Sequence, residues 1–598
     1  MQDRAQEIVK EQVDSLQAKH VTNGALIALR PSTGEILAMV GSADFDNKDI
    51  QGEINMSVIP RQPGSSIKPL TYLAAFEKGW TPATLIWDVH SEFPPSGDPN
   101  DPRDPYEPVN YDEKFHGPVT VRTALANSYN VPAVKALDFV GIYDDPETEV
   151  EEGLVPFAQR LGITTLTRND YGLALTLGGG EVTLLDLTSF YATMANGGRQ
   201  VPPVAITRIE DFLGNLVYEY QVPTGEQVVR AEHVYLISTI LSDTRARVPG
   251  FGTNPVINLP FAVAAKTGTT NDFRDNWTLG YTPDLAVGVW VGNADYTPMQ
   301  DTSGLTGAAP IWAAFMQEGI QRLTGGNPSG FSRPAGIIER VICSVSGTEP
   351  SKYCPSQRSE YFAADQPPLP ADQDLWEEVV VDTWTNKLWS SACGDYHTEK
   401  LGIHVDDPWA KKWLKNDPDG KAWANDMGLT KKPYIIDETK ICSDTDSRPI
   451  LEFASPRNED ILLVSPVELF ARVDATSNFG DARLEYGPGK DPVQWEVLTT
   501  INDPVTSISE IFSWDLNQIN TGWITLRLYL TGLNDGFAEK RIQIDVQVPT
   551  PTPTPTLSPT PTLTLTPTLT NTPVVSNTPT PTPTHTATPI PPTINPPP

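Results

Sequence analysis

The order of apolar patterns in the first 330 residues restricts the fold more than any other feature of this chain. Two apolar runs, residues 25–30 and 35–40, are separated by a Pro-Ser-Thr-Gly turn and predict a hairpin of buried strands. Helical periodicity follows, and strand-like runs then return at residues 261–270, 276–281 and 285–292. Because strands flank a helical middle, the sequence predicts an α+β domain with an antiparallel sheet.

The helical stretches of this domain are each opened or closed by proline, glycine or a capping residue. We expect helices at residues 65–79, 120–128, 131–141 and 183–198. The stretch at residues 311–323 predicts a closing helix that packs on the sheet.

The chain of 598 residues is too long for one core, and its composition changes along its length. Short alternating runs between turns predict a β-sandwich, whereas the last 50 residues hold 17 prolines and no Asp, Glu, Lys or Arg. We expect a helical linker at residues 1–20, the α+β domain at 21–330, an irregular cysteine-containing connector at 331–449, an Ig-like sandwich at 450–548 and a disordered Pro/Thr-rich tail at 549–598.

The charge of the chain excludes some partners. Lys and Arg number 43 against 75 Asp and Glu, a net charge of −32 that repels polyanions, so we expect no nucleic-acid partner. The amino terminus has no apolar leader, and no apolar run reaches the roughly 18 residues of a membrane span. We therefore expect no membrane segment in this chain.

Metal and cofactor motifs are not evident. The cysteines lack CxxC spacing and the seven histidines are scattered. Residues 415–426 suggest a calcium loop, but Lys415 occupies the first ligand position, which favours a turn. We expect neither a metal nor an organic cofactor.

All four cysteines lie in the connector, which fits an exported chain with disulfides. Four cysteines allow three pairings. Of these we favour Cys343 with Cys354 and Cys393 with Cys442.

Ser65 and Lys68 form an SxxK motif at the expected start of a helix, and their i, i+3 spacing puts both side chains on one face. A serine becomes a nucleophile when a neighbouring base takes its proton, and lysine can be that base if burial or another cation lowers its pKa. Helix capping is the alternative explanation for the same residues.

Ser128 and Asn130 form an SxN motif between two helical stretches, where a loop can present both side chains together. The hydroxyl could relay a proton and the amide could hold a substrate carbonyl. Both residue types are also common in turns.

Residues 266–269 form a KTG motif, Lys266, Thr267, Gly268 and Thr269, on a strand after an apolar run. The lysine and the two hydroxyls could bind a carboxylate, and the glycine would let a substrate backbone approach closely. The edge of the strand could pair with an extended peptide.

In the order SxxK, SxN and KTG, these motifs form the set typical of penicillin-binding proteins and class A β-lactamases. The segments RQPGSSIKPL, LANSYNVPAVK and AAKTGTTNDFRDNW extend the match. Residues about 20–325 closely resemble the transpeptidase domain of class A penicillin-binding proteins. The resemblance implies the penicillin-binding, β-lactamase-like fold for the α+β domain.

The resemblance also implies a reaction, in which Ser65 attacks the penultimate D-Ala carbonyl of a peptidoglycan stem peptide and an amine acceptor resolves the ester. Lys68 would be the base for Ser65, Ser128 would pass a proton to the leaving amine, and Lys266 would tune the pKa of Ser128. β-Lactam antibiotics would acylate Ser65 as substrate mimics.

The binding residues follow by the same analogy. Asn130 would hold the acyl-side amide, while Thr267 and Thr269 would bind the terminal carboxylate. The backbone N–H groups of Ser65 and Thr269 would form the oxyanion hole.

In this family a membrane anchor and a glycosyltransferase domain precede the transpeptidase domain, and residues 1–20 resemble the linker between the two domains. We therefore expect a fragment of a longer gene product. Its expected location is extracytoplasmic, at the outer face of the bacterial membrane or cell wall. Its expected partners are stem peptides, β-lactams and cell-wall assembly proteins.

Three alternatives share these motifs. A β-lactamase would need a second base for deacylation. No convincing glutamate loop lies between Asn130 and Lys266, and Glu181 is better interpreted as a capping residue at the N-terminus of a helix. A D,D-carboxypeptidase differs only in using water as acceptor. A sensor would bind without turnover, but binding alone does not require both lysines beside both serines.

Overall fold

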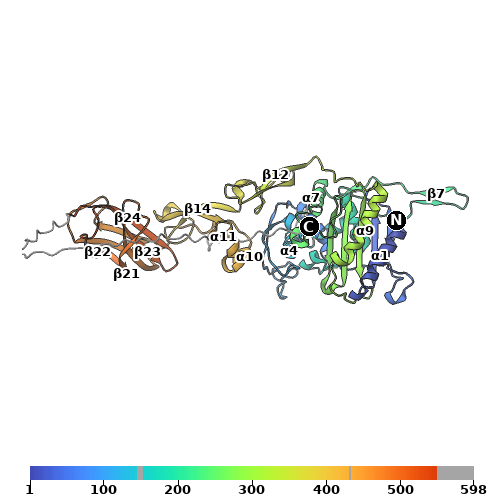
Figure 1. Cartoon of the computed structure of the whole chain (residues 1–598), viewed down its shortest axis with the longest axis horizontal. Helices are drawn as coiled ribbons and strands as arrows, with labels where there is room; N and C mark the ends of the chain where they lie inside the picture. Colours follow the sequence, from blue (N-terminus) through green and yellow to red (C-terminus); the bar gives the residue numbers. More distant parts are fainter. Residues whose placement is uncertain (145–151, 430–432, 549–598) are drawn as a thin grey trace, which may run out of the picture.

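The computed structural model describes residues 1–144, 152–429 and 433–548. Figure 1 shows an elongated molecule, with the α+β domain at one end, the sandwich at the other, and small sheets between them. The expected Pro/Thr-rich tail, residues 549–598, lies outside the described residues. Within the described part, no helix has both the length and the apolar character needed to cross a membrane.

A five-stranded antiparallel sheet forms the centre of the α+β domain, in the order β2-β1-β11-β10-β9. Strand β1 from the start of the domain pairs with β11 near its end, with Leu26 opposite Val289. Every residue of β1, β10 and β11 is buried, because both faces of the sheet are covered. The strands are β1 Asn23–Leu29, β2 Ile36–Val40, β9 Ala264–Thr269, β10 Asp275–Thr282 and β11 Leu285–Gly292.

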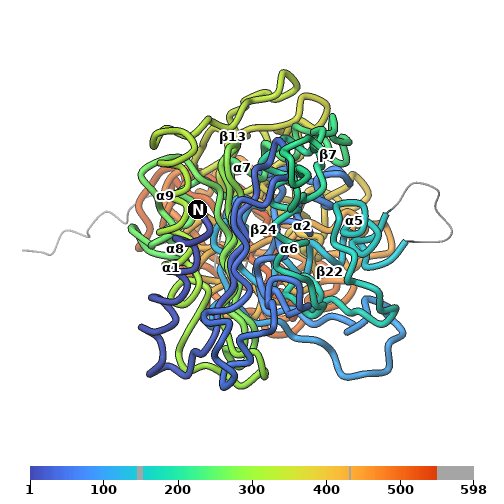
Figure 2. The backbone as a smooth tube through the Cα atoms, turned by 90° about the vertical axis from the view of Figure 1, so that its right-hand side faces the viewer, coloured from blue at the N-terminus to red at the C-terminus, as the bar shows by residue number. Residues whose placement is uncertain are grey.

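Helices cover the two faces of this sheet, so the domain has three layers. Figure 2 shows α1 and α9 on one side of the strands and α2 and α6 on the other. The main helices of the domain are α1 Gln2–Ser15, α2 Lys68–Glu77, α3 Val121–Ala126, α4 Asn130–Val140, α5 Leu154–Arg160, α6 Leu184–Ala195, α7 Ala231–Leu241 and α9 Ala309–Thr324. The α+β prediction is confirmed, and only α5 and α7 of this set were not expected from the sequence.

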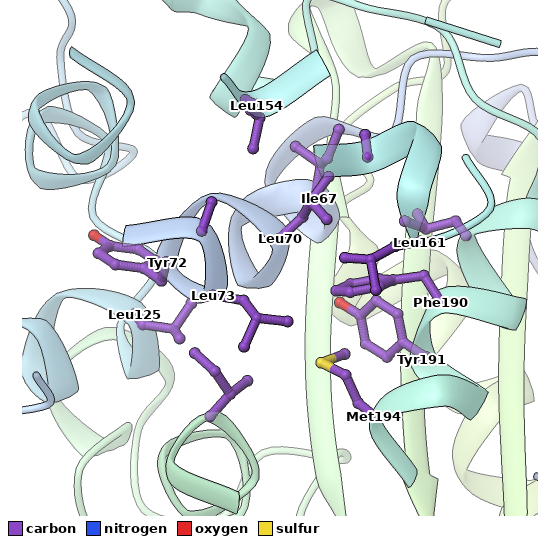
Figure 3. Packing of buried hydrophobic residues seen from close by; sticks show 14 of the residues in the cluster. Ile67, Leu70, Tyr72, Leu73, Leu125, Leu154, Leu161, Phe190, Tyr191 and Met194 are labelled. Atoms are coloured by element: carbon purple, nitrogen blue, oxygen red, sulfur yellow. The ribbon is translucent and has the colours of Figure 1, made fainter. Parts of the chain in front are cut away.

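Helix α2 lies at the centre of the larger hydrophobic cluster. Leu70 and Leu73 of α2 pack with Leu125 of α3 and with Phe190 and Tyr191 of α6 (Figure 3). This packing fixes the helix that begins at the SxxK motif. Just before it lies a single 3₁₀ turn, η3 Gly64–Ile67.

The α+β domain also contains smaller elements. In its described residues, three two-stranded sheets and one short helix lie between the main elements. They are β3 Leu85–Asp88 with β4 Gly117–Thr120, β5 Arg199–Gln200 with β8 Glu226–Gln227, β6 Arg208–Glu210 with β7 Leu216–Glu219, and α8 Val248–Phe251.

The connector holds more regular structure than its sequence predicts. Strands β12 Ile337–Cys343 and β13 Gln357–Ala363 form a hairpin, and β14 Trp376–Asp382, β15 His397–Ile403 and β16 Tyr434–Ile435 form a second sheet. Two helices follow one another, α10 Pro408–Asn416 and α11 Pro418–Asp426. The middles of β12 and β14 are largely exposed, so the apolar alternation that would have indicated strands is missing.

The disulfide pairing expected for the connector is confirmed, since Cys343 bonds to Cys354 and Cys393 to Cys442. Residues 415–426, favoured as a turn, contain the end of α10 and the whole of α11. The side chain of Asp417 caps α11 by accepting from Asp419 N at 2.8 Å. Across the described ranges, no group of three or more His, Cys, Asp or Glu side chains is arranged to hold a metal.

The sandwich prediction is confirmed. One sheet has the order β17-β19-β22 and the other β18-β24-β23-β20-β21. Leucine and alanine side chains from both sheets fill the space between them. The strands are β17 Pro449–Ser455, β18 Ile461–Leu462, β19 Val467–Ala475, β20 Phe479–Pro488, β21 Glu496–Ile501, β22 Val505–Trp514, β23 Gly522–Gly532 and β24 Phe537–Val546.

Candidate active site

Ser65 lies in turn η3, directly before α2. Gly64 has a φ of +55°, and a Cβ there would come within 2.6 Å of Thr269 O, so glycine is needed where the turn meets β9. The hydroxyl of the buried Ser66 donates to Pro63 O at 2.7 Å. Ser65 is half-buried and lines a pocket, so its hydroxyl is the one available to a substrate.

Lys68 is the first residue of α2 and is fully buried. Its Nζ donates to Ser128 O at 2.6 Å, to Asn130 Oδ1 at 2.7 Å and to Tyr129 O at 3.1 Å. All three acceptors are neutral. Burial, and next the charge of Lys266, hold the pKa of Lys68 well below its ordinary value.

Ser128 connects the two lysines. Lys266 Nζ donates to Ser128 Oγ at 2.7 Å and to Thr267 O at 2.9 Å, while Lys68 Nζ is 3.5 Å from the same hydroxyl. Ser128 has a φ of +62°, an unusual left-handed conformation for serine. Burial, and next the charge of Arg247, lower the pKa of Lys266 to about 7.

Ser65 and Ser128 line a pocket of about 220 Å³, and the two lysines lie buried behind its wall. Strand β9 forms one wall, the Ser128 loop forms a second, and residues 249–251 form a third. The pocket is lined by Ser65, Tyr111, Asp112, Asn127, Ser128, Tyr129, Asn130, Pro249, Gly250, Phe251, Thr267, Gly268, Thr269, Ser303 and Leu305. The sequence motifs supply six of these residues.

The same segments match known families. Residues 24–317 match the penicillin binding protein transpeptidase domain, and residues 333–369 match the C-terminal domain of penicillin-binding protein 1A. This chain carries a penicillin-binding transpeptidase domain. The resemblance to class A penicillin-binding proteins is thereby confirmed.

Curated relatives carry the same family name. Penicillin-binding protein 2D of Bacillus subtilis (strain 168) is 29% identical over 374 residues, which cover 62% of this chain and 50% of that protein. Penicillin-binding protein 1A of Aquifex aeolicus (strain VF5) is 38% identical over 300 residues, 49% of this chain and 38% of that protein. The chain spans half or less of the length of these two relatives.

A similar solved structure is penicillin-binding protein 1A from Haemophilus influenzae, with 24% identity and a TM-score of 0.49, covering 58% of this chain and 54% of that one. Another is the penicillin-binding protein PonA1 from Mycobacterium tuberculosis, with 22% identity and a TM-score of 0.46, covering 56% of this chain and 85% of that one.

A buried carboxylate that the sequence did not reveal supports the transpeptidase site. Asp88 is fully buried, accepts from Asn110 Nδ2 at 2.8 Å and lies 2.6 Å from His116 Nδ1. Asn110 Oδ1 in turn accepts from Asn130 N at 2.6 Å. Although burial lowers the pKa of His116, its hydrogen bond to Asp88 and the Asp88 charge raise it overall. The His116 ring stacks on Tyr129 at 3.9 Å and so steadies the Ser128 loop.

Gly268 is required by packing within the transpeptidase domain itself. A Cβ at this position would lie 2.3 Å from Pro63 O and 2.9 Å from Ser66 N. The turn carrying Ser65 therefore makes a close approach at this position, and the expected approach of a substrate backbone stays a prediction. The lack of a side chain at Gly268 lets the nucleophile turn pack directly on β9.

The remaining predicted binding residues also line the pocket, and part of their hydrogen-bonding capacity is already in use. Asn130 Oδ1 accepts from Lys68, and its Nδ2 donates to Val109 O at 2.7 Å. Thr269 Oγ1 accepts from Gly304 N at 2.9 Å. Thr267 is nearly buried.

Glu181 does not cap a helix, contrary to the expectation from sequence. The cap of α6 is Thr183, whose side chain accepts from Asp186 N. Glu181 is exposed, and its backbone carbonyl accepts from Thr165 Oγ1 at 2.8 Å. It does not line the pocket.

Proposed function

We propose that this chain is a serine-type D-alanyl-D-alanine transpeptidase that cross-links peptidoglycan stem peptides through an acyl-enzyme on Ser65. The observation that carries the proposal is the placement of the Ser128 hydroxyl between the amines of Lys68 and Lys266, in the pocket lined by Ser65. Two buried lysines beside one hydroxyl can pass a proton at neutral pH only if at least one amine is uncharged. Their lowered pKa values support that condition.

Acylation would use Lys68 as the base. Its neutral amine would take the proton of Ser65 while Ser65 Oγ attacks the penultimate D-Ala carbonyl, forming the new C–O bond. The N–H groups of Ser65 and Thr269 would stabilise the oxyanion. Ser128 would give its proton to the leaving D-Ala nitrogen as the C–N bond breaks. The Lys68 ammonium, which holds the proton taken from Ser65, would then protonate Ser128 Oγ again.

Deacylation would run the same steps in reverse with an acceptor amine, and Ser65 would regain its proton. Thr267, Thr269 and Lys266 would bind the terminal carboxylate of the donor peptide. Asn130 would orient Lys68. Its Nδ2 would release its hydrogen bond to Val109 O and donate instead to the acyl-side carbonyl of the substrate. The outcome is one amide bond broken and one formed.

The location follows from the family, whose members act on peptidoglycan outside the cytoplasm. Two disulfides in the connector support an oxidising compartment. We place this chain at the outer face of the bacterial membrane or cell wall, where stem peptides, β-lactams and cell-wall assembly proteins are available as partners.

The proposal is tested with the full chain, a stem-peptide donor ending in D-Ala-D-Ala, an amine acceptor, and Ser65→Ala as the inactive control. We expect release of D-Ala together with a cross-linked dimer, both detected by mass spectrometry and both absent from the control. D-Ala without dimer would establish a carboxypeptidase. Penicillin adduct without any D-Ala release would establish a sensor that binds without turnover.

A further inference from the structure

A buried ion pair joins the transpeptidase domain to the hairpin of the connector. Arg122, at the start of α3, donates from Nε and Nη2 to the two carboxylate oxygens of Glu360 on β13, at 2.7 and 2.6 Å. The Glu360 residue is only 3% exposed. Arg358 also donates from Nη1 to Glu360 Oε2 at 2.7 Å and from Nη2 to Thr120 Oγ1 at 3.2 Å. Because Thr120 caps α3, Glu360 holds the start of this helix by two routes.

Arg122 also reaches the wall of the pocket. Its Nη1 donates to Thr239 O at 3.1 Å and to Asp243 Oδ2 at 3.3 Å. Asp243 Oδ1 accepts the backbone N–H groups of Arg245 and Ala246 at 3.0 and 2.9 Å. These contacts fix the beginning of the segment 243–251, here called the wall segment.

The wall segment carries two features of the site. Residues 249–251 line the pocket beside Ser128. Arg247 is buried in the middle of the segment, and its positive charge lowers the pKa of Lys266. A shift of the segment would therefore change both the shape of the pocket and the surroundings of the KTG lysine.

The far end of α3 is tied to the same segment. Asn127, which precedes Ser128, donates from Nδ2 to Ala246 O at 2.8 Å and accepts at Oδ1 from Gly250 N at 2.7 Å. Helix α3 spans only Val121–Ala126, and Ser128 directly follows its C-cap residue Asn127, so a displacement of Arg122 is passed through one short helix to the Ser128 loop. Glu360, through Arg122, thus bears on both the Ser128 loop and the wall segment.

We propose that Glu360 is a positioning residue for acyl transfer, by which the connector hairpin holds Ser128 and the wall segment in their reactive arrangement. The inference rests on the proposed reaction at Ser65. Without the Glu360 carboxylate, buried Arg122 has Asp243 as its remaining carboxylate partner and would draw the wall segment toward itself. Small displacements of this kind slow a reaction strongly, because the proton donor no longer meets the reacting atoms.

The test is stopped-flow acylation of the full chain by a chromogenic cephalosporin, which separates initial binding, acylation rate constant and stoichiometry. For Glu360→Gln we expect the acylation rate constant to fall at least about tenfold. Initial binding should change by less than about threefold, and the stoichiometry should stay near one acyl group per chain.

Asp365→Asn is the matched control. The Asp365 carboxylate pairs with Arg230 at 2.9 Å across the same boundary, but both side chains are largely exposed and neither touches the pocket or the wall segment. Its kinetics should equal those of the wild type. If Glu360→Gln has an unchanged acylation rate constant and only fewer acyl groups per chain, Glu360 has a purely structural role. This result would overturn the proposal.

Glu360→Asp covers the case in which the Gln variant does not fold. It retains the charge but is too short for both contacts with Arg122, so the rate constant should fall a few-fold; an unchanged rate would also overturn the proposal. If the wild-type chain is not acylated at all, it is the proposed reaction that fails.

Discussion

The transpeptidase site and the sandwich bury basic side chains in opposite ways. In the site, Lys68 and Lys266 face neutral acceptors, and both pKa values are lowered. In the sandwich, Arg527 pairs with Glu485 and Glu539, so charge meets opposite charge. Two carboxylates therefore compensate the charge of Arg527, whereas burial disfavours the charged forms of Lys68 and Lys266, as expected where a reaction needs a neutral amine.

The backbone contrast between the two regions is weaker. The sandwich places Glu459, Asn478 and Asp535 at positive φ, and of these Asn478 and Asp535 are residue types that tolerate the left-handed region in turns. The site places Ser128 there, beside two lysines. Positive φ at residues other than glycine therefore also occurs away from the site, and Ser128 is distinguished by its position beside the two lysines.

The largest expected effect is that of Lys68→Arg. Arginine remains charged at all accessible pH values, so it cannot accept the proton of Ser65. We expect penicillin acylation to slow by at least about a hundredfold, measured by stopped flow. Acylation within a few-fold of the wild type would contradict the assignment of Lys68 as base.

Gly268→Ala should come next. The new Cβ would collide with Pro63 O and displace the turn that carries Ser65. We expect acylation to fall at least about tenfold. Gly330→Ala is the control, because a Cβ at Gly330 meets no atom within 4 Å. Equal acylation by the two variants would show that the turn does not need this contact.

The lowered pKa of Lys266 predicts how stability depends on pH. At pH 8 an unfolded lysine, with its ordinary pKa of 10.5, is protonated, whereas the folded Lys266, with a pKa of about 7, is mostly neutral. Unfolding then takes up a proton, so this residue makes the stability of the domain rise between about pH 7 and 10.5.

Scanning calorimetry of the full chain at pH 7 and pH 9 measures this effect. The transpeptidase transition should move upward with pH more in the wild type than in Lys266→Met. The sandwich transition should show no such difference between the two proteins. Parallel shifts of the transpeptidase transition would mean that Lys266 keeps an ordinary pKa.

The smallest effect on acylation is expected for Leu528→Ala. Leu528 is fully buried between the two sheets of the sandwich, and its truncation should cost about 2–5 kcal/mol of sandwich stability. Acylation should remain within about twofold, since the site is elsewhere. A larger loss of acylation would show that the sandwich supports the site.

Local patterns made much of the transpeptidase fold predictable. The hairpin strands, the helix after Ser65 and the closing helix have clear periodicity and end at prolines or glycines, and the short runs in the sandwich region alternate between apolar and polar residues. Motif spacing and family resemblance together identified Ser65, Lys68, Ser128 and Lys266; in the structure Ser65 and Ser128 line one pocket, and both lysines contact Ser128.

Features that depend on distant contacts were not predictable. Asp88 and His116 belong to the site only because β3 and β4 pair beside Asn130, and the need for glycine at 268 comes from a turn far away in sequence. Likewise, the exposed middles of the connector strands hide their alternation, and nothing local to Glu360 indicates its pairing with Arg122.

The central claim is that Ser65 is the nucleophile of this transpeptidase domain. Its most direct test is peptide mapping by mass spectrometry after the full chain has been incubated with penicillin. We predict one adduct per chain, located on the peptide that contains Ser65, and no adduct in a folded Ser65→Ala variant. An adduct on another residue, or stoichiometric labelling of Ser65→Ala, would contradict the claim.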